Sequence, residues 1–218
     1  MLFVPHHPRL LSVCLAVGAL FTTIEANAAH ERELGISIEP SLVVLPAVAS
    51  ESSQNTLAFS PAGGFSAEYS FINNLAVIWR TAYAFAVTDS LIGQASFQNR
   101  QGNYYFRQQA LLTSAGLRLD TPAHWMPIEL SASVQGGAAI LIQTDRELRD
   151  DQGIKYKLPQ PLTTLVRAAP LLVVTGGISA RVWHQVRLGV EPTLFLGFFG
   201  RTYVGFGVNA ALTFLFFV

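Results

Sequence analysis

The C-terminal residues 202–218 carry the most regular alternation of apolar and polar positions in the chain. Every second residue, counted back from Val218, is apolar as far as Val204, and the residues between them are mostly smaller or more polar. Successive side chains of a β-strand point to opposite faces, so a period of two predicts a strand with one apolar face. A strand of this length with an aromatic-rich end is unusual in a soluble protein and typical of one that crosses a membrane.

The same alternation predicts seven further strands. In the first, Ile36, Ile38, Pro40, Leu42 and Val44 share one face. A soluble β-sandwich would turn polar residues outward, whereas here the regular face is the apolar one. The pattern therefore predicts an all-β fold, an eight-stranded antiparallel up-and-down transmembrane β-barrel. The expected strands cover residues 34–45, 63–72, 75–87, 104–119, 128–142, 165–182, 186–196 and 202–218.

The chain is half hydrophobic, so transmembrane helices are the alternative to a barrel. The best candidate, residues 162–180, is apolar enough but contains Arg167, Pro170 and two glycines, Gly176 and Gly177. Its content of β-branched residues and glycine suits a strand better than a membrane-spanning helix. This segment is therefore assigned to the barrel.

The connections between the expected strands alternate between long and short. The long ones are residues 46–62, 88–103 and 143–164, and the last connection on that side, 198–201, is a tight turn. Outer-membrane barrels have short periplasmic turns, such as the one expected at Asn73-Asn74, and longer extracellular loops. The alternation places both termini of the mature chain in the periplasm and the long loops outside the cell.

The N-terminal region has the features of a secretory signal peptide. A short basic start containing Arg9 precedes an apolar run at residues 10–21 that is too short to span a bilayer. Ala26-Asn27-Ala28 then provides a cleavage site, so residues 1–28 are the expected signal peptide and residues 29–218 one barrel domain. Cys14, the only cysteine, lies in the segment that is removed, and the mature chain has no disulfide.

The whole mature sequence resembles the small eight-stranded outer-membrane barrels of the OmpA and OmpX type. The resemblance rests on the pattern of strands and loops rather than on a diagnostic motif. The chain ends in Val218 after Phe216 and Phe217, where this family usually ends in phenylalanine. The resemblance implies insertion by the barrel-assembly machinery, a place in the bacterial outer membrane, and contact with outer-membrane lipid and lipopolysaccharide.

Charged residues occur on the inward face of the expected strands. Eight strands leave a lumen just filled by side chains, and a buried charge is tolerated only when it is paired. The sequence therefore predicts a network of glutamate–arginine pairs that plugs the lumen, with a charged ion or proton path as the alternative. Glu39, Glu68, Arg80 and Glu191 are expected at one height, and Arg118 is expected to face Glu129. The full set is Glu39, Glu68, Arg80, Arg118, Glu129, Arg181, Arg187 and Glu191, with Arg167 on the same face.

No enzymatic site is predicted. Lipid A deacylases and palmitoyltransferases resemble this chain in size and use a serine and a histidine near the outer leaflet. The mature histidines, His30, His124 and His184, all fall on the periplasmic side of the expected topology. Asp89-Ser90 in the second long loop therefore has no histidine to act as its base. We assign no catalytic residue and no cofactor.

Metal and nucleic-acid sites are not predicted either. The acidic residues of segment 145–151 are interleaved with arginines, which disfavours a calcium site of oxygen ligands. The formal net charge of zero gives no electrostatic reason to bind nucleic acid.

The sequence thus predicts a monomeric, non-enzymatic outer-membrane barrel with a structural or surface-interaction role through its extracellular loops and a possible extracellular surface partner. The alternative is a small-molecule binding or conduit barrel with a vestibule open to the outside. Small residues line the outer half of the lumen in support of that alternative, unless Leu112, Leu171, Phe195 and Tyr203 fill it. The small residues are Gly64, Ser66, Ala82, Ala84, Ala86, Ser133, Gly137, Ala139, Gly205 and Gly207.

Overall fold

The structure is a computed structural model, and it describes residues 32–46, 57–72, 74–85, 89–97, 100–121, 128–150, 152–157, 165–200 and 202–217. The predicted signal peptide, residues 1–28, lies outside the described residues. The strands are β1 (Glu33–Pro46), β2 (Leu57–Ile72), β3 (Leu75–Ala84), β4 (Asp89–Phe97), β5 (Arg100–Asp120), β6 (Ile128–Arg149), β7 (Lys155–Lys157), β8 (Leu165–Trp183), β9 (Val186–Phe198) and β10 (Thr202–Phe217). Within these ranges no helix is long and apolar enough to cross a membrane.

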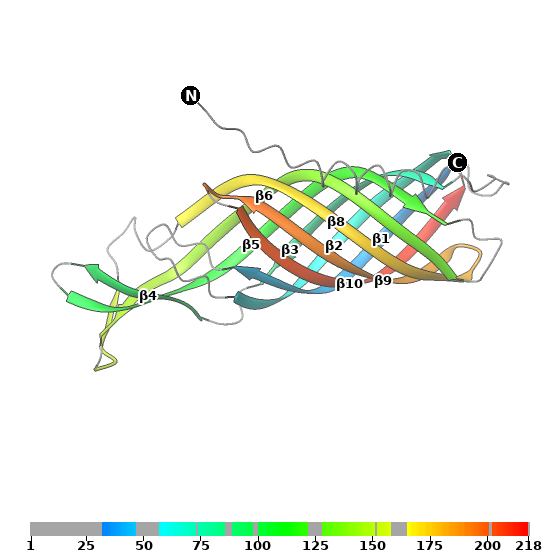
Figure 1. Cartoon of the computed structure of the whole chain (residues 1–218). Helices are drawn as coiled ribbons and strands as arrows, with labels where there is room; N and C mark the ends of the chain where they lie inside the picture. Colours follow the sequence, from blue (N-terminus) through cyan, green and yellow to red (C-terminus); the bar gives the residue numbers. More distant parts are fainter. Residues whose placement is uncertain are drawn as a thin grey trace, which may run out of the picture.

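Eight of the strands close into a barrel (Figure 1). Their order around the ring is β1-β2-β3-β5-β6-β8-β9-β10, every neighbouring pair is antiparallel, and β1 pairs with β10 to close the ring. The predicted fold class, an eight-stranded antiparallel barrel, is confirmed. At the end of the barrel where β1 begins and β10 ends, the first or last residue of each barrel strand differs from the prediction by no more than one position.

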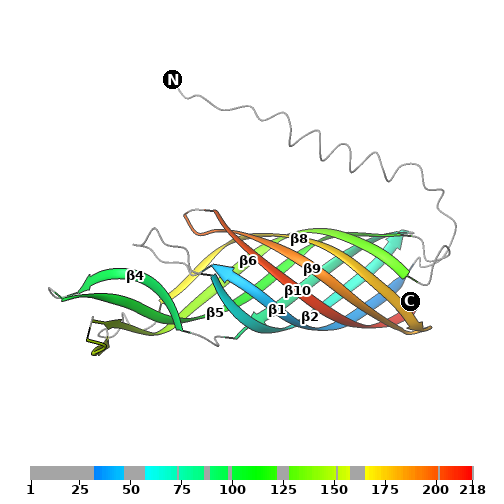
Figure 2. The same cartoon turned by 60° about the horizontal axis from the view of Figure 1, so that its bottom comes forward.

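The two ends of the barrel differ. At one end, here called the short-turn end, Glu33 of β1 lies opposite Phe217 of β10, and His184 and Gln185 turn β8 into β9. Asn74, in the predicted turn between β2 and β3, has a φ of 69°, which asparagine tolerates. At the other end, here called the hairpin end, β5 and β6 continue past the ring side by side and pair with β4 and β7 (Figures 1 and 2).

The loop predictions at the hairpin end were wrong in part. Segment 88–103 contains β4 and the start of β5, segment 143–164 contains the end of β6 and all of β7, and β2 begins at Leu57 inside the expected loop 46–62. Outside the membrane neither face of a strand needs to be apolar, so the period-two pattern disappears while the hydrogen-bond ladder continues. The four strands β4, β5, β6 and β7 form one sheet that projects from the barrel, here called the projecting sheet.

The outer surface of the barrel is apolar, as the alternation predicted. Val134 and Ile178 have 57% and 58% of their surface exposed, and the residues on either side of each are buried. Exposed apolar side chains on every barrel strand are what a lipid-facing surface requires.

Two glycines allow β5 and β6 to approach closely in the middle of their ladder. A Cβ added at Gly116 would lie 2.0 Å from the Val134 carbonyl oxygen, and one at Gly137 would lie 1.9 Å from that of Thr113. No larger residue fits there without moving the backbone, so the absence of a side chain at Gly137 serves the close pairing of β5 with β6.

Candidate functional site in the barrel lumen

The short-turn half of the lumen is filled by a continuous series of ion pairs. Arg80 on β3 reaches across the barrel to two carboxylates: its Nε lies 2.8 Å from Oε2 of Glu39 on β1, and its Nη2 donates to Glu191 on β9. Arg118 on β5 approaches the other oxygen of Glu191, with its Nη1 2.7 Å from Oε1. Glu191 therefore joins two arginines from neighbouring strands on the opposite wall.

The series continues toward the short-turn end. Nη1 of Arg118 lies 3.3 Å from Oε2 of Glu68, and Arg187 also donates to Glu68. Nη1 of Arg187 lies 3.6 Å from Oε2 of Glu129. Arg181 then lies between Glu129, with its Nε 3.9 Å from Oε1, and Glu33, with its Nη2 3.1 Å from Oε1. We call these residues, together with Asp120, the lumen charge network: Glu33, Glu39, Glu68, Arg80, Arg118, Asp120, Glu129, Arg181, Arg187 and Glu191.

All eight residues of the predicted network point into the lumen, but their partners differ from the expected ones. Glu68 lies with Arg118 and Arg187 instead of beside Arg80. Arg118 does not face Glu129, because it lies opposite Ser133 in the β5–β6 register and Glu129 is nearer the short-turn end. The stagger of barrel strands shifts partners along the axis, and residue parity alone does not contain this shift. Arg167 lies in the hairpin half of the lumen, opposite Leu141.

Two acidic members of the network were missed. Glu33 is 4% exposed, and Asp120 accepts from Nε of Arg118 at 2.9 Å. Each lies one residue beyond the end of a predicted strand, at 34–45 and 104–119, and extending those strands by one position would have placed both side chains inward.

Glycines make room for the carboxylates. A Cβ at Gly35 would lie 2.7 Å from Cγ of Glu68, and one at Gly177 would lie 3.0 Å from Cγ of Glu191.

The two carboxylates that pair with Arg80 lie in segments of similar sequence, a signal that the sequence analysis missed. Glu39 is followed by Pro-Ser-Leu, and Glu191 is followed by Pro-Thr-Leu.

A belt of uncharged polar side chains lies on the hairpin side of the lumen charge network. Oγ of Ser114 donates to Gln135 at 2.8 Å, Nε2 of Gln135 donates to Ser133 at 2.8 Å, and the Ser133 and Thr175 hydroxyls lie 2.7 Å apart. Hydrogen bonding within the belt compensates the loss of water that burial imposes.

An apolar cluster occupies the hairpin half beside Arg167. Leu112, Leu171 and Phe195 are buried with 5%, 5% and 7% of their surface exposed, and Phe199 and Tyr203 pack against the cluster. The Phe195 ring covers Gly207 of the expected vestibule, since its Cε2 lies 3.0 Å from where a Cβ of that glycine would be, and Cβ of Phe195 lies 3.6 Å from the same position at Gly205. Other small residues of that set, including Ala84 and Ala139, belong to the same cluster. Ala86 lies outside the described residues.

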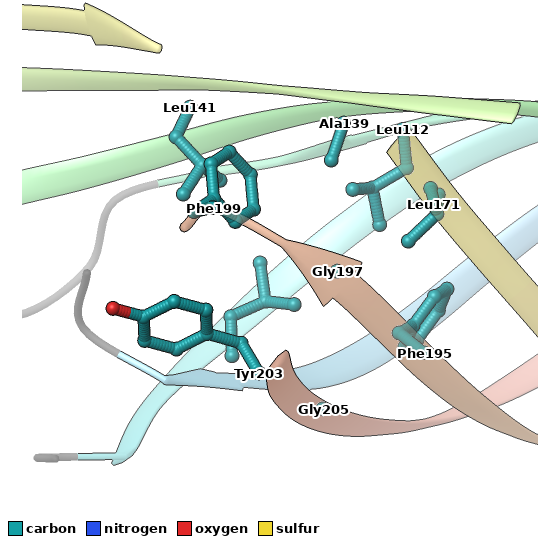
Figure 3. Close-up of a pocket in the computed structure, with 10 residues that line it drawn as sticks. Leu112, Ala139, Leu141, Leu171, Phe195, Gly197, Phe199, Tyr203 and Gly205 are labelled. Atoms are coloured by element: carbon teal, nitrogen blue, oxygen red, sulfur yellow. The ribbon is translucent and has the colours of Figure 1, made fainter. Parts of the chain in front are cut away.

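A small apolar pocket of about 30 Å³ remains at the mouth of this cluster (Figure 3). Its lining comes from β1, β5, β6, β8, β9 and β10, and from Phe199 in the turn between β9 and β10. Phe195 lies at its inner side, and Phe199 and Tyr203 lie together on the other side.

The described residues bring no enzymatic constellation together. His184 is exposed in the β8–β9 turn at the short-turn end, whereas His30, His124 and the Ser90 side chain lie outside the described part. Within the same ranges, no three His, Cys, Asp or Glu residues are grouped to hold a metal ion. Of the acidic segment 145–151, Asp150 accepts hydrogen bonds from the backbone of Gln152 and Ile154 and so stabilises the hairpin turn.

An apolar exterior, a filled lumen and a ring of eight antiparallel strands define a small transmembrane β-barrel. No protein-family model and no curated protein matches the sequence. Solved structures of three such barrels are similar in fold, and the chain has the fold of the small OmpA and OmpX type. Neisserial surface protein A has a TM-score of 0.55 and 11% identity, covering 83% of this chain and 96% of that one. OprG from Pseudomonas aeruginosa has a TM-score of 0.55 and 9% identity, covering 87% and 99%. Ail, the attachment invasion locus protein of Yersinia pestis, has a TM-score of 0.51 and 12% identity, covering 85% and 99%.

Proposed function

We propose that this protein is a monomeric, non-enzymatic barrel of the bacterial outer membrane, closed to ions by its lumen charge network, that makes surface contacts through the projecting sheet. The observation that carries the proposal is the combination of a filled lumen with a sheet that extends past it. A closed barrel has no transport route along its axis, so we expect its function to reside in the part that lies outside the membrane. Barrel-assembly machinery would insert it among outer-membrane lipid and lipopolysaccharide.

The geometry of the network supports closure. Arg80 spans from β3 to carboxylates on β1 and β9, and Arg118 on β5 joins the second of them. These strands lie around the ring, so the side chains cross the lumen instead of lining one wall. Removing water from paired charges is tolerated only where the pairing is complete, which favours a dense plug over an open, ion-conducting path.

The architecture of the projecting sheet supports a contact role. Phe106 and Leu148 are each 1% exposed, and the Arg149 guanidinium lies 4.1 Å from the centre of the Tyr105 ring, so the sheet has packing of its own. Among the described residues β4 pairs with β5 alone and β7 with β6 alone, which leaves an outer edge on each. Edge strands accept an extended segment of a partner through main-chain hydrogen bonds. The name of Ail, a barrel of this fold, refers to attachment and invasion.

The alternative of a conduit has less support. The apolar cluster occupies the half of the lumen that the small residues were expected to leave open, and the lumen charge network occupies the short-turn half.

The contact role is tested by shortening a hairpin. A variant in which a two-residue Asn-Gly turn replaces segment 88–103 should keep the barrel, judged by its heat-dependent migration on gels, and lose binding to lipopolysaccharide and to cultured epithelial cells. The control is Trp183→Ala, a change of an exposed residue at the opposite end of the barrel. Undiminished binding by a folded, shortened barrel would contradict a role for this hairpin.

The orientation is tested by labelling. Gln152 and Gln185 are both exposed in turns, one at each end of the barrel, and the mature chain has no cysteine. A membrane-impermeant thiol reagent applied to intact cells should label Gln152→Cys and leave Gln185→Cys unlabelled. The reverse result would place the projecting sheet in the periplasm and remove the basis of the proposal.

A further inference from the structure

The apolar pocket at the hairpin end has a covering side chain and a closed floor, which distinguishes it from an ordinary packing gap. Its lining side chains are leucine, alanine and phenylalanine, and the only polar side-chain atom among them is the Tyr203 hydroxyl. A buried water needs two to four polar partners, so a pocket of about 30 Å³ with this lining is not built to hold one.

Phe199 covers the pocket from a turn that directs two neighbouring aromatic rings to opposite sides. Phe198 points outward with 45% of its surface exposed, while Phe199 turns inward against the apolar cluster. The chain reverses at Gly200, whose φ of 77° strongly favours glycine. The Phe199 ring packs edge to face on Tyr203, with centroids 5.9 Å apart, and its Cε2 lies 3.0 Å from where a Cβ of Gly197 would be.

The Phe199 ring can pack in this position because Gly197 has no side chain. The ring is half-buried and is attached to a tight turn, so rotating it outward would expose the pocket without changing the barrel wall. The space then freed is the volume of one aromatic ring added to the existing cavity. Apolar cavities of about 150 Å³ in proteins stay dry and bind benzene.

The floor of the pocket excludes passage. Phe195 lies at the inner side of the pocket, and Val173, 2% exposed, is its register partner on β8. Gln135 of the hydrogen-bonded polar layer lies opposite Val173 on β6, nearer the lumen charge network. An apolar molecule gains nothing by moving from leucine side chains into this hydrogen-bonded layer. The pocket is therefore a blind chamber that opens toward the hairpin end.

We infer that the hairpin half of the lumen is a binding chamber for one small, uncharged apolar molecule, of the size of a single aromatic ring, and that the Phe199 side chain is its cover. The ligand would lie among Leu112, Leu141 and Leu171, which line the pocket together with Phe199 and Tyr203. This inference goes beyond the proposed function and does not depend on it, since a chamber above a closed floor needs neither conductance nor a surface partner.

Benzene, titrated into the refolded full-length mature barrel in phospholipid nanodiscs, tests the chamber, with methyl NMR of leucines as the readout. Leu112 and Leu171 in the lumen should show shifts that saturate, whereas Leu117 and Leu188, which face the lipid, should show only the linear change of benzene dissolving in the bilayer. The lipid-facing methyl groups thus serve as an internal control in every sample.

Two matched variants test the cover. Phe199→Ala should lower the benzene concentration at half-saturation about tenfold, because the ligand no longer displaces a packed ring. Phe198→Ala removes the same side chain from the outward-facing neighbour and should leave that concentration unchanged. The inference fails if the Leu112 and Leu171 shifts do not saturate in either the unaltered protein or Phe199→Ala. It also fails if Phe198→Ala lowers the half-saturation concentration as much as Phe199→Ala does.

Discussion

The two halves of the lumen fill the same narrow space by opposite means. The short-turn half holds four arginines and six carboxylic side chains joined in one series. The hairpin half holds a cluster of leucine, valine, alanine and phenylalanine side chains, and the charged residue Arg167 lies beside this cluster. Apolar packing tolerates exchange between side chains of similar volume, whereas a buried charge depends on each partner and on its direction. The charged half should therefore be the part of the barrel that is least tolerant of substitution.

Glycines serve both halves in different ways. Gly35 and Gly177 leave space for the carboxylate arms of Glu68 and Glu191, whereas Gly207 lies beneath the flat ring of Phe195. In both halves the missing side chain admits a large one from a neighbouring strand.

Removal of Arg118 should have the largest effect on stability. Its guanidinium meets Glu68, Asp120 and Glu191, and only 5% of the side chain is exposed, so Arg118→Ala leaves three carboxylates without that partner. Breaking a buried pair in this way typically costs about 3–5 kcal/mol. The free energy of unfolding is measured in urea with the barrel in liposomes.

The control is Arg107→Ala on the same strand. The Arg107 side chain is 56% exposed and its partner Asp145 is 70% exposed, so the loss should be about 0–1 kcal/mol. Equal losses from the two variants would mean that Arg118 is hydrated and that the network is not a dry plug.

Truncation in the apolar half should cost less. Leu171→Ala removes a buried side chain beside an existing pocket, where neighbours can move in, so we expect about 2–3 kcal/mol, in the lower part of the range for buried leucines. Leu171→Met should be nearly neutral, whereas Arg118→Lys, which keeps the charge, should still destabilise, because one ammonium cannot reproduce the arginine fork. If Arg118→Lys is as mild as Leu171→Met, the difference between the two halves disappears.

The smallest expected effect on stability concerns two adjacent glycines in β8, Gly177 on the inner face and Gly176 on the outer face. Gly177→Ala would bring a Cβ within 2.5 Å of the Ser131 hydroxyl and 3.0 Å of Cγ of Glu191, and overpacking of this kind costs about 1–3 kcal/mol. Gly176→Ala meets nothing within 4 Å on the outer face and should be neutral or slightly stabilising. The same urea measurement separates them, and a larger loss for Gly176→Ala would reverse the assigned inward and outward faces of β8.

The sequence was sufficient to predict the barrel because lipid requires an apolar outer face on each strand, and this requirement appears in the sequence as an apolar residue at every second position. Each strand between the two membrane surfaces alternates, and residues such as Leu42 and Val190 lie on the outer face as expected. Inward parity also placed Glu39, Arg80 and Glu191 in the lumen. These results follow from a strict period of two and require no knowledge of the register between strands.

The features that the sequence did not predict depend on the register between strands and on the parts of the strands that lie beyond the membrane. The pairing of Arg118 with Glu191 instead of Glu129 arises from the stagger of strands around the ring. The projecting sheet was missed because segment 143–149 has no apolar alternation, although it continues the β6 ladder. The inward turn of Phe199 depends on the backbone at Gly200, which strand periodicity does not describe.

The central claim, that the lumen charge network closes the barrel, is tested most directly by planar-bilayer recording of the refolded protein at neutral pH. The network and the apolar cluster fill successive layers of an eight-stranded lumen, which has little spare cross-section. We expect no single-channel steps under an applied voltage, with insertion verified by protease-resistant barrel in the same membranes. Stable single-channel steps from the inserted, unaltered protein would contradict the plug and support the conduit instead.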